Sequence, residues 1–113
     1  MYRIGRGVDR SKDAVALYRR AAWKKNGNAM FNLGTADYNG DGVGIDDATS
    51  YAWFRLAQEN GSNNADDAVR RTDLELPSRK INEGFRKTAG FYVNGVDLPK
   101  DYAESAKWLR KSR

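Results

Sequence analysis

Apolar residues recur at helical spacing in about six stretches of the chain, and these stretches predict its secondary structure. The first stretch places five apolar residues on one face of a helix with about 3.6 residues per turn. These residues are Ala14, Leu17, Tyr18, Ala21 and Ala22. Ser11 is a suitable N-cap, so we expect this helix to run from about residue 12 to residue 25.

The same spacing predicts five further helices. We expect them at about 28–39, 47–60, 64–74, 78–93 and from 99–101 to the end of the chain. Their expected inward-facing residues include Ala29, Leu33, Gly34 and Ala36, then Trp53, Phe54 and Ala57, then Ala65, Ala68 and Val69, and then Ile81, Phe85, Ala89 and Tyr92. The last helix carries Ala106, Trp108 and Leu109. A glycine inside a helix costs about 1 kcal/mol relative to alanine, so Gly34 predicts a close approach between helices.

Turn residues mark the ends of these predicted helices. Four Asn-Gly pairs follow helical stretches: Asn26-Gly27, Asn39-Gly40, Asn60-Gly61 and Asn94-Gly95. Glycine adopts the left-handed conformation after a helix at little cost, so we expect each pair to end a helix. Pro77 breaks the backbone and can begin a new helix. Two acidic pairs, 46–47 and 66–67, fall at helix starts, where carboxylates cap and stabilise the first turn.

Both the turns and the helices repeat along the chain. A Gly-x-Gly-Val sequence at 40–43 recurs at 5–8, 40 − 5 = 35 positions earlier, and a looser copy lies at 92–98. We expect these copies to be corners between helices. The first helix of each period also recurs, and its equivalent positions hold Leu17, Trp53 and Trp108. Their numbers differ by 53 − 17 = 36 and by 108 − 53 = 55, so the second period is longer than the first.

A period in the thirties with two helices per period is typical of an α-solenoid. We therefore predict an all-α fold, a right-handed superhelix of antiparallel helix pairs in a single domain spanning 1–113. The expected division is the end of a preceding repeat (1–9), a repeat (10–45), a lengthened repeat (46–98) and the first helix of a further repeat (99–113). On this division the chain is expected to be a fragment of a longer protein.

The repeat resembles the Sel-one-like repeat, a relative of the tetratricopeptide repeat. That repeat typically runs A-x-x-W-Y-x-x-A-A and then A-x-x-x-L-G-x-x-Y-x-x-G-x-G-V-x-x-D. The first half is matched by Ala14, Leu17, Tyr18, Ala21 and Ala22, and the second by Ala29, Leu33, Gly34, Gly40, Gly42, Val43 and Asp46. Leu17 stands where the repeat has tryptophan and Asp37 where it has an aromatic residue, and residues 70–90 depart most from the pattern.

The resemblance implies a function in recognition. Such repeats are adaptors in multi-protein assemblies, often in bacterial envelope and host-interaction settings, and they have no common catalytic residues. It therefore implies a scaffold that binds a partner protein or peptide on the concave face of the solenoid. The alternative is a charge-driven self-assembly or docking module of a larger bacterial envelope or regulatory protein.

The composition of the chain excludes several classes of functional site. The chain has no cysteine and no histidine, which removes disulfides, Cys/His zinc sites and the Ser-His and Cys-His catalysts. It also lacks a phosphate-binding loop, a nucleophile elbow and a dinucleotide fingerprint, so we expect no enzymatic activity and no cofactor. No apolar run approaches the about 18 residues of a membrane helix, so no membrane span is expected. A cysteine-free chain suits the bacterial cytoplasm, the periplasm or secretion alike.

One segment also resembles the first half of a calcium loop. The D-x-N-x-D-G pattern is formed by Asp37, Asn39, Asp41 and Gly42. Such a loop needs a bidentate carboxylate at its twelfth position, which is Ala48 here. Asp46 and Asp47 are out of register by one or two positions. The helix-to-helix turn is therefore favoured, and no metal ligand is predicted.

Charge is unevenly distributed along the chain. Residues 1–25 carry eight basic and two acidic side chains, residues 26–68 one and seven, and residues 69–113 eleven and six. The ends are therefore basic and the middle is acidic. The acidic block interrupts any continuous basic track, so nucleic acid is not an expected partner despite the net charge of +5.

Basic residues at equivalent helix positions are the candidate binding residues. Arg19, Arg55 and Arg110 repeat in the first helix of each period, where they could grip an acidic partner through bidentate hydrogen bonds. The alternative is a solvated helix face. Trp23 is either an interface anchor or a residue packed on Met30. The full predicted partner-binding set is Arg19, Arg20, Trp23, Tyr51, Arg55, Arg110 and Lys111.

Overall fold

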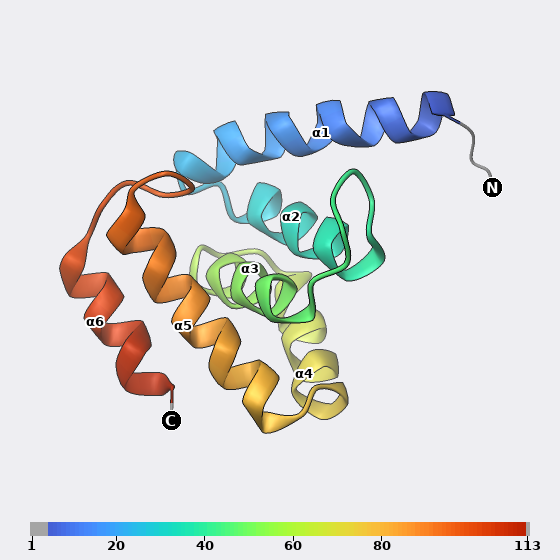
Figure 1. Cartoon of the computed structure of the whole chain (residues 1–113). Coiled ribbons are helices and arrows are strands. Elements are labelled where there is room, and N and C mark those ends of the chain that lie inside the picture. Colours follow the sequence, from blue (N-terminus) through green and yellow to red (C-terminus); the bar gives the residue numbers. More distant parts are fainter. Residues whose placement is uncertain (1–4, 113) are drawn as a thin grey trace.

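In the computed structural model the chain forms a stack of α-helices (Figure 1). The structure describes residues 5–112, with side chains from residue 12 onward, and this range contains six helices and no strand. The helices are α1 (Gly5–Trp23), α2 (Gly27–Asn39), α3 (Asp47–Glu59), α4 (Ala65–Glu75), α5 (Ser78–Asn94) and α6 (Tyr102–Lys111). The predicted all-α superhelix is confirmed.

Neighbouring helices pack in the order α1, α2, α3, α5 and α6, and α4 lies against α3 (Figure 1). Helix α3 is therefore the centre of the stack, with α2 on one side and α5 on the other. Its buried residues include Trp53 and Phe54, and the end helix α6 contributes the buried Trp108. These aromatic side chains follow the predicted inward faces.

The hairpins α2–α3 and α5–α6 are two copies of one unit. In each copy the glycine after the first helix is left-handed, with φ of 80° at Gly40 and 66° at Gly95. In each copy an aspartate caps the second helix: Asp46 and Asp101 accept hydrogen bonds from amides further along the first turn, at 3.1 and 3.0 Å. The amide of each aspartate also donates, at 3.0 Å, to a carbonyl in the last turn of the preceding helix. The repeat seen in the sequence is thus a repeat of backbone geometry.

Close packing at Gly34 joins α2 to α3, as its position inside a helix predicts. A Cβ atom at Gly34 would lie 2.6 Å from Cδ1 of Phe54. The Phe54 ring also packs against Phe31 and Tyr38, with ring centroids 5.6 and 6.5 Å away. The Ser50 hydroxyl donates a 2.8 Å hydrogen bond to the Gly34 carbonyl. Only a residue without a side chain permits this contact.

The first helix is longer than its sequence suggests. Helix α1 begins at Gly5, so Ser11 is not its N-cap and the predicted corner at residues 5–8 is wrong. Residues 2–4 of that motif lie outside the described residues. Glycine disfavours a helix by only about 1 kcal/mol, and α1 contains no proline, so nothing in its sequence forbids the longer helix.

The structure also differs from the prediction at the Asn26-Gly27 pair, which begins α2 instead of ending α1. The left-handed residue after α1 is Lys25, with φ of 67°, whereas Asn26 caps α2 by accepting a 3.0 Å hydrogen bond from the Ala29 amide. Gly27 is the first residue of α2, and a Cβ atom there would lie 2.5 Å from the Asn60 carbonyl oxygen. Gly27 is therefore needed for close packing rather than for a left-handed turn.

The structure corrects a third prediction, the inward position of Leu17. It was expected on the inward face beside Tyr18, but 62% of it is exposed, while Val15 is buried instead. Its counterpart Trp53 stacks on Phe91 of α5, with ring centroids 4.8 Å apart. Helix α1 packs mainly on α2, and among the described helices it has no second neighbour comparable to the α5 helix that packs on α3. Leu17 is therefore not covered by another side chain and stays exposed.

The remaining helices begin and end close to the predicted positions. Pro77 precedes α5 in an extended conformation rather than beginning it. Asp66 and Asp67 lie in the first turn of α4, as expected.

Substituting Gly34 by alanine should destabilise the fold by about 1–3 kcal/mol, because the added Cβ must displace the Phe54 ring. The free energy of unfolding from urea titration followed by circular dichroism measures this change. Gly90 is the matched control, since it is also inside a helix but a Cβ there meets nothing within 4 Å. Gly90→Ala should stabilise the protein by up to about 1 kcal/mol. Equal effects of the two substitutions would contradict the packing assigned to Gly34.

Candidate functional site

The structure places the predicted partner-binding residues in two regions of the fold. Three of them lie at the C-terminal end of α1: Arg19, Arg20 and Trp23. The other four are Tyr51 and Arg55 on α3, and Arg110 and Lys111 at the end of α6.

The first surface is an open cavity of about 590 Å³. It is lined by Arg19, Arg20, Trp23, Lys24 and Val96. Val96 comes from the loop between α5 and α6, which the superhelix brings next to the end of α1 (Figure 1). Trp23 is 41% exposed and Val96 76% exposed, so the cavity offers apolar area beside its cations. We refer to it below as the α1 cavity.

The α1 cavity has an excess of positive charge. Arg19 is ion-paired, with 2.8 Å between its Nη1 and Oδ1 of Asp97. Within residues 12–112, neither Arg20 nor Lys24 has a carboxylate at ion-pair distance. Three cations are thus offset by one carboxylate, and the pair that does form is partly exposed and therefore weak. The cavity can accept a further negative group.

The second surface centres on Arg55, which is half-buried on α3. Its guanidinium lies over the Tyr51, Phe85 and Trp108 rings, 5.9, 5.3 and 6.0 Å from the three centroids. One of its N–H groups donates a 3.2 Å hydrogen bond to the Tyr51 hydroxyl. The cation is held by aromatic faces rather than by an acid.

Tyr51 itself cannot contact a partner as predicted, because only 1% of it is exposed. Its hydroxyl donates a 2.6 Å hydrogen bond to Asp73 of α4. Burial and this hydrogen bond raise the pKa of Tyr51 to about 12, so the hydroxyl stays protonated. Tyr51 contacts Arg55 through its ring and its hydroxyl, and it does not present a surface of its own.

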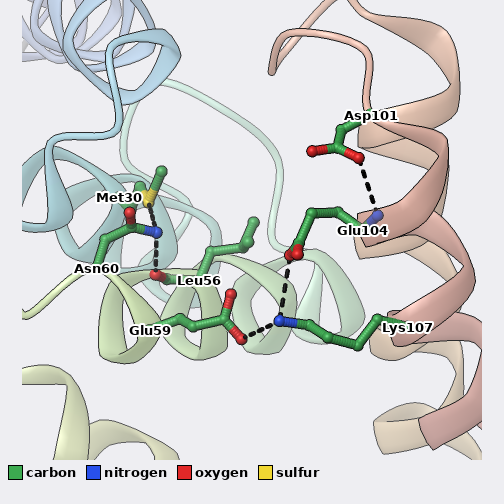
Figure 2. A network of polar contacts seen from close by, with 7 residues as sticks. All are labelled: Met30, Leu56, Glu59, Asn60, Asp101, Glu104 and Lys107. Carbon is green, nitrogen blue, oxygen red and sulfur yellow. Dashed lines mark hydrogen bonds and ion pairs between the residues drawn. The ribbon is translucent and has the colours of Figure 1, made fainter.

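At the end of α6, Arg110 and Lys111 are exposed, and the Lys111 ammonium lies 5.6 Å from the Trp108 ring centroid. Figure 2 shows the neighbouring Lys107 between Glu59 and Glu104, at 3.0 and 3.2 Å, where it ties α6 to α3. The hydrogen bond to Glu59, followed by the one to Glu104, raises the pKa of Lys107.

The calcium-like segment is part of a helix and its turn. Asp37 and Asn39 lie in α2, and Asp41 follows the left-handed Gly40. Among the described residues there is no group of three or more His, Cys, Asp or Glu side chains that could hold a metal ion.

Asp37 is instead a buried acid with a perturbed pKa. Burial, reinforced by the nearby Asp46 carboxylate, raises its pKa from 3.8 to about 6, while Arg19 opposes the shift. It corresponds to Tyr92 of the second hairpin, where an aromatic ring fills the space. The substitution noted in the sequence thus puts a titratable group in the core.

Three residues around the α1 cavity were not predicted: Lys24, Val96 and Asp97. In the second hairpin Asp97 corresponds to Gly42 of the first, where the repeat pattern has its second glycine. This departure from the repeat pattern is the sequence feature that could have indicated Asp97. Lys24 and Val96 have no comparable signal, because only the superhelix places them together.

The fold and its repeated hairpin define the chain as an α-solenoid of helical repeats. A family model described as the Sel1 repeat matches residues 1–22, 27–62 and 87–112, so the chain belongs to the Sel1 repeat family. Searches of curated proteins and of solved structures give no match. Sel1 repeats are generally protein–protein interaction modules of a non-catalytic scaffold type. In the described part of the chain, no helix combines the length and apolar character needed to cross a membrane.

The family model leaves out residues 63–86, which form α4 and the first half of α5. Acidic residues of α4 accept hydrogen bonds from side chains of α2 and α3. Tyr51 donates to Asp73 at 2.6 Å, Tyr38 to Glu75 at 2.7 Å, and Gln58 to Asp66 at 3.1 Å. This insertion accounts for the lengthened second period.

The raised pKa of Asp37 makes stability depend on pH. The folded state holds the Asp37 proton more tightly than the unfolded state, so stability should fall as the pH rises from about 4 to 6. Asp37→Asn removes this penalty and should stabilise the protein by about 2 kcal/mol above pH 6, with little change near pH 4.

Urea unfolding at about pH 4 and about pH 8 measures this difference. Asp41→Asn, at an exposed position in the same segment, is the matched control and should leave stability unchanged at both values. A stabilisation by Asp37→Asn that is the same at both pH values would contradict the assignment.

Proposed function

We propose that this protein is a non-catalytic interaction module whose α1 cavity binds an acidic segment of a partner protein. The observation that carries the proposal is the convergence of Arg19, Arg20 and Lys24 with a half-exposed tryptophan on one open cavity. Membership of the Sel1 repeat family supports a role in protein interaction.

The side chains of the cavity suit a peptide better than a small metabolite. Arginine binds carboxylates through a planar fork of donors, which gives both energy and orientation. Trp23 and Val96 add apolar surface for a side chain beside the acid, and tryptophan and arginine are common among the residues that dominate binding energy. An open cavity fits a chain that passes across it.

Nucleic acid is a poorer fit to the same surface. The helices next to α1 carry the acidic block of residues 26–68, which has one basic and seven acidic side chains. A phosphate backbone running from the cavity across α2 and α3 would meet like charge, whereas a short acidic peptide would not. We therefore infer a protein partner rather than a nucleic acid.

Selection of a random peptide library on the immobilised protein tests this function. Enriched peptides should be rich in Asp and Glu, and Arg20→Glu should weaken their binding at least about tenfold, measured by fluorescence anisotropy. Lys12→Glu is the matched control, because it makes the same charge change at an exposed position of α1 outside the cavity, and it should have little effect.

Enrichment without acidic residues, or equal losses with the two variants, would contradict the proposal. Light scattering of the protein alone at low and high salt separates partner binding from charge-driven self-assembly. A monomer at low salt counts against self-assembly, since attraction between basic ends and acidic middles is strongest there.

A further inference from the structure

Arg55 is the centre of an aromatic cluster built from three helices. Tyr51 comes from α3, Phe85 from α5 and Trp108 from α6, and each ring centroid lies within 6.0 Å of the guanidinium carbon. The rings also pack on each other, edge to face between Tyr51 and Phe85 at 5.6 Å and tilted between Phe85 and Trp108 at 6.2 Å. A guanidinium against such faces keeps a fixed position, since ring and cation attract.

The charge of Arg55 has no acidic partner within the part of the chain that the structure describes. The nearby acids are engaged elsewhere, Asp73 by the Tyr51 hydroxyl at 2.6 Å and Glu59 by Lys107 at 3.0 Å. A guanidinium has five N–H donors, and the structure gives Arg55 one side-chain hydrogen bond, to Tyr51. Because Arg55 is only half-buried, its remaining donors can reach a ligand from solvent.

The orientation of Arg55 is set by a chain of hydrogen bonds. Asp73 accepts from the Tyr51 hydroxyl, and the same hydroxyl accepts from Arg55 at 3.2 Å. Asp73 belongs to α4, which lies outside the family match, so the family pattern does not include this support. A cation fixed before binding loses less conformational entropy when a ligand arrives.

From this geometry we infer that Arg55 binds a side-chain carboxylate of the acidic partner, as a second contact site besides the α1 cavity. The inference rests on the proposed function for the class of partner, and adds a second site to it. Lys111, whose ammonium lies 5.6 Å from the Trp108 centroid, adds positive charge to the same surface. Two separate basic sites, at Arg20 and at Arg55, suit a segment with several acidic side chains rather than a single chain terminus.

The test uses the full chain and two synthetic probes, an oligoglutamate peptide and an oligoglutamine peptide, both with amidated C-termini. Arg55→Lys keeps the charge but removes the planar fork, and should weaken oligoglutamate binding about fivefold or more, measured by isothermal titration calorimetry at low salt. Arg86→Lys, at an exposed position of α5, is the matched control and should bind as the wild type does. Oligoglutamine should not bind, and oligoglutamate with a free C-terminus should bind no better than the amidated form.

A second measurement does not depend on a variant folding correctly. In the wild-type protein the Nε–H resonance of Arg55 should shift during an oligoglutamate titration and stay fixed with oligoglutamine.

A further variant tests the hydrogen bond that orients Arg55. Tyr51→Phe keeps the ring but removes the hydroxyl, so it should weaken oligoglutamate binding less than Arg55→Lys does.

The outcomes separate this inference from the proposed function. If Arg20→Glu abolishes binding while Arg55→Lys binds as the wild type does and the Arg55 resonance does not move, the Arg55 site is wrong and the α1 cavity stands. If neither Arg20→Glu nor Arg55→Lys changes binding, the proposed function fails as well. Binding that requires a free C-terminus would overturn the assignment to a side-chain carboxylate.

Discussion

The structure depends on α3 burying both of its faces. On one face Phe54 fills the space left by Gly34 of α2, and on the other Trp53 stacks on Phe91 of α5 at 4.8 Å. The remaining helices are attached outward from this pair of interfaces, α1 to α2 and α6 to α5. In a solenoid each element is stabilised mainly by its neighbours, so losing either face of α3 would divide the stack into parts that bury too little apolar surface.

The same arrangement creates the binding surfaces. Packing the hairpins one on another turns the chain so that the end of α1 lies beside the α5–α6 loop, where Arg19 meets Asp97 from the far end of the sequence. Stacking α6 on α5 likewise brings Trp108 to the guanidinium of Arg55. Both surfaces therefore exist only while the superhelix is intact, and a change in the packing of α3 would alter recognition at each of them.

Sequence reasoning was most successful where the determining interactions are local. The cap within the acidic pair 46–47 and the left-handed glycines at 40 and 95 involve residues only a few positions apart, so the local sequence located them. It was wrong at the start of α1, where two glycines suggested a corner that the helix passes through. It also misassigned Gly27, because the carbonyl of Asn60 that excludes a side chain there lies far along the chain, after α3.

By itself the sequence determined the all-α class, the helix boundaries from α2 onward and the basic residues available for binding, because helical period and capping depend on near neighbours. Only the tertiary structure decided which of those residues reach the surface. Leu17 is exposed and Trp53 buried although they occupy equivalent positions, since Trp53 has a second helix to cover it and Leu17 does not. Tyr51 became a buried support and Arg55 a cation held by three rings for the same reason: burial depends on contacts between residues far apart in the chain, which a local pattern cannot specify.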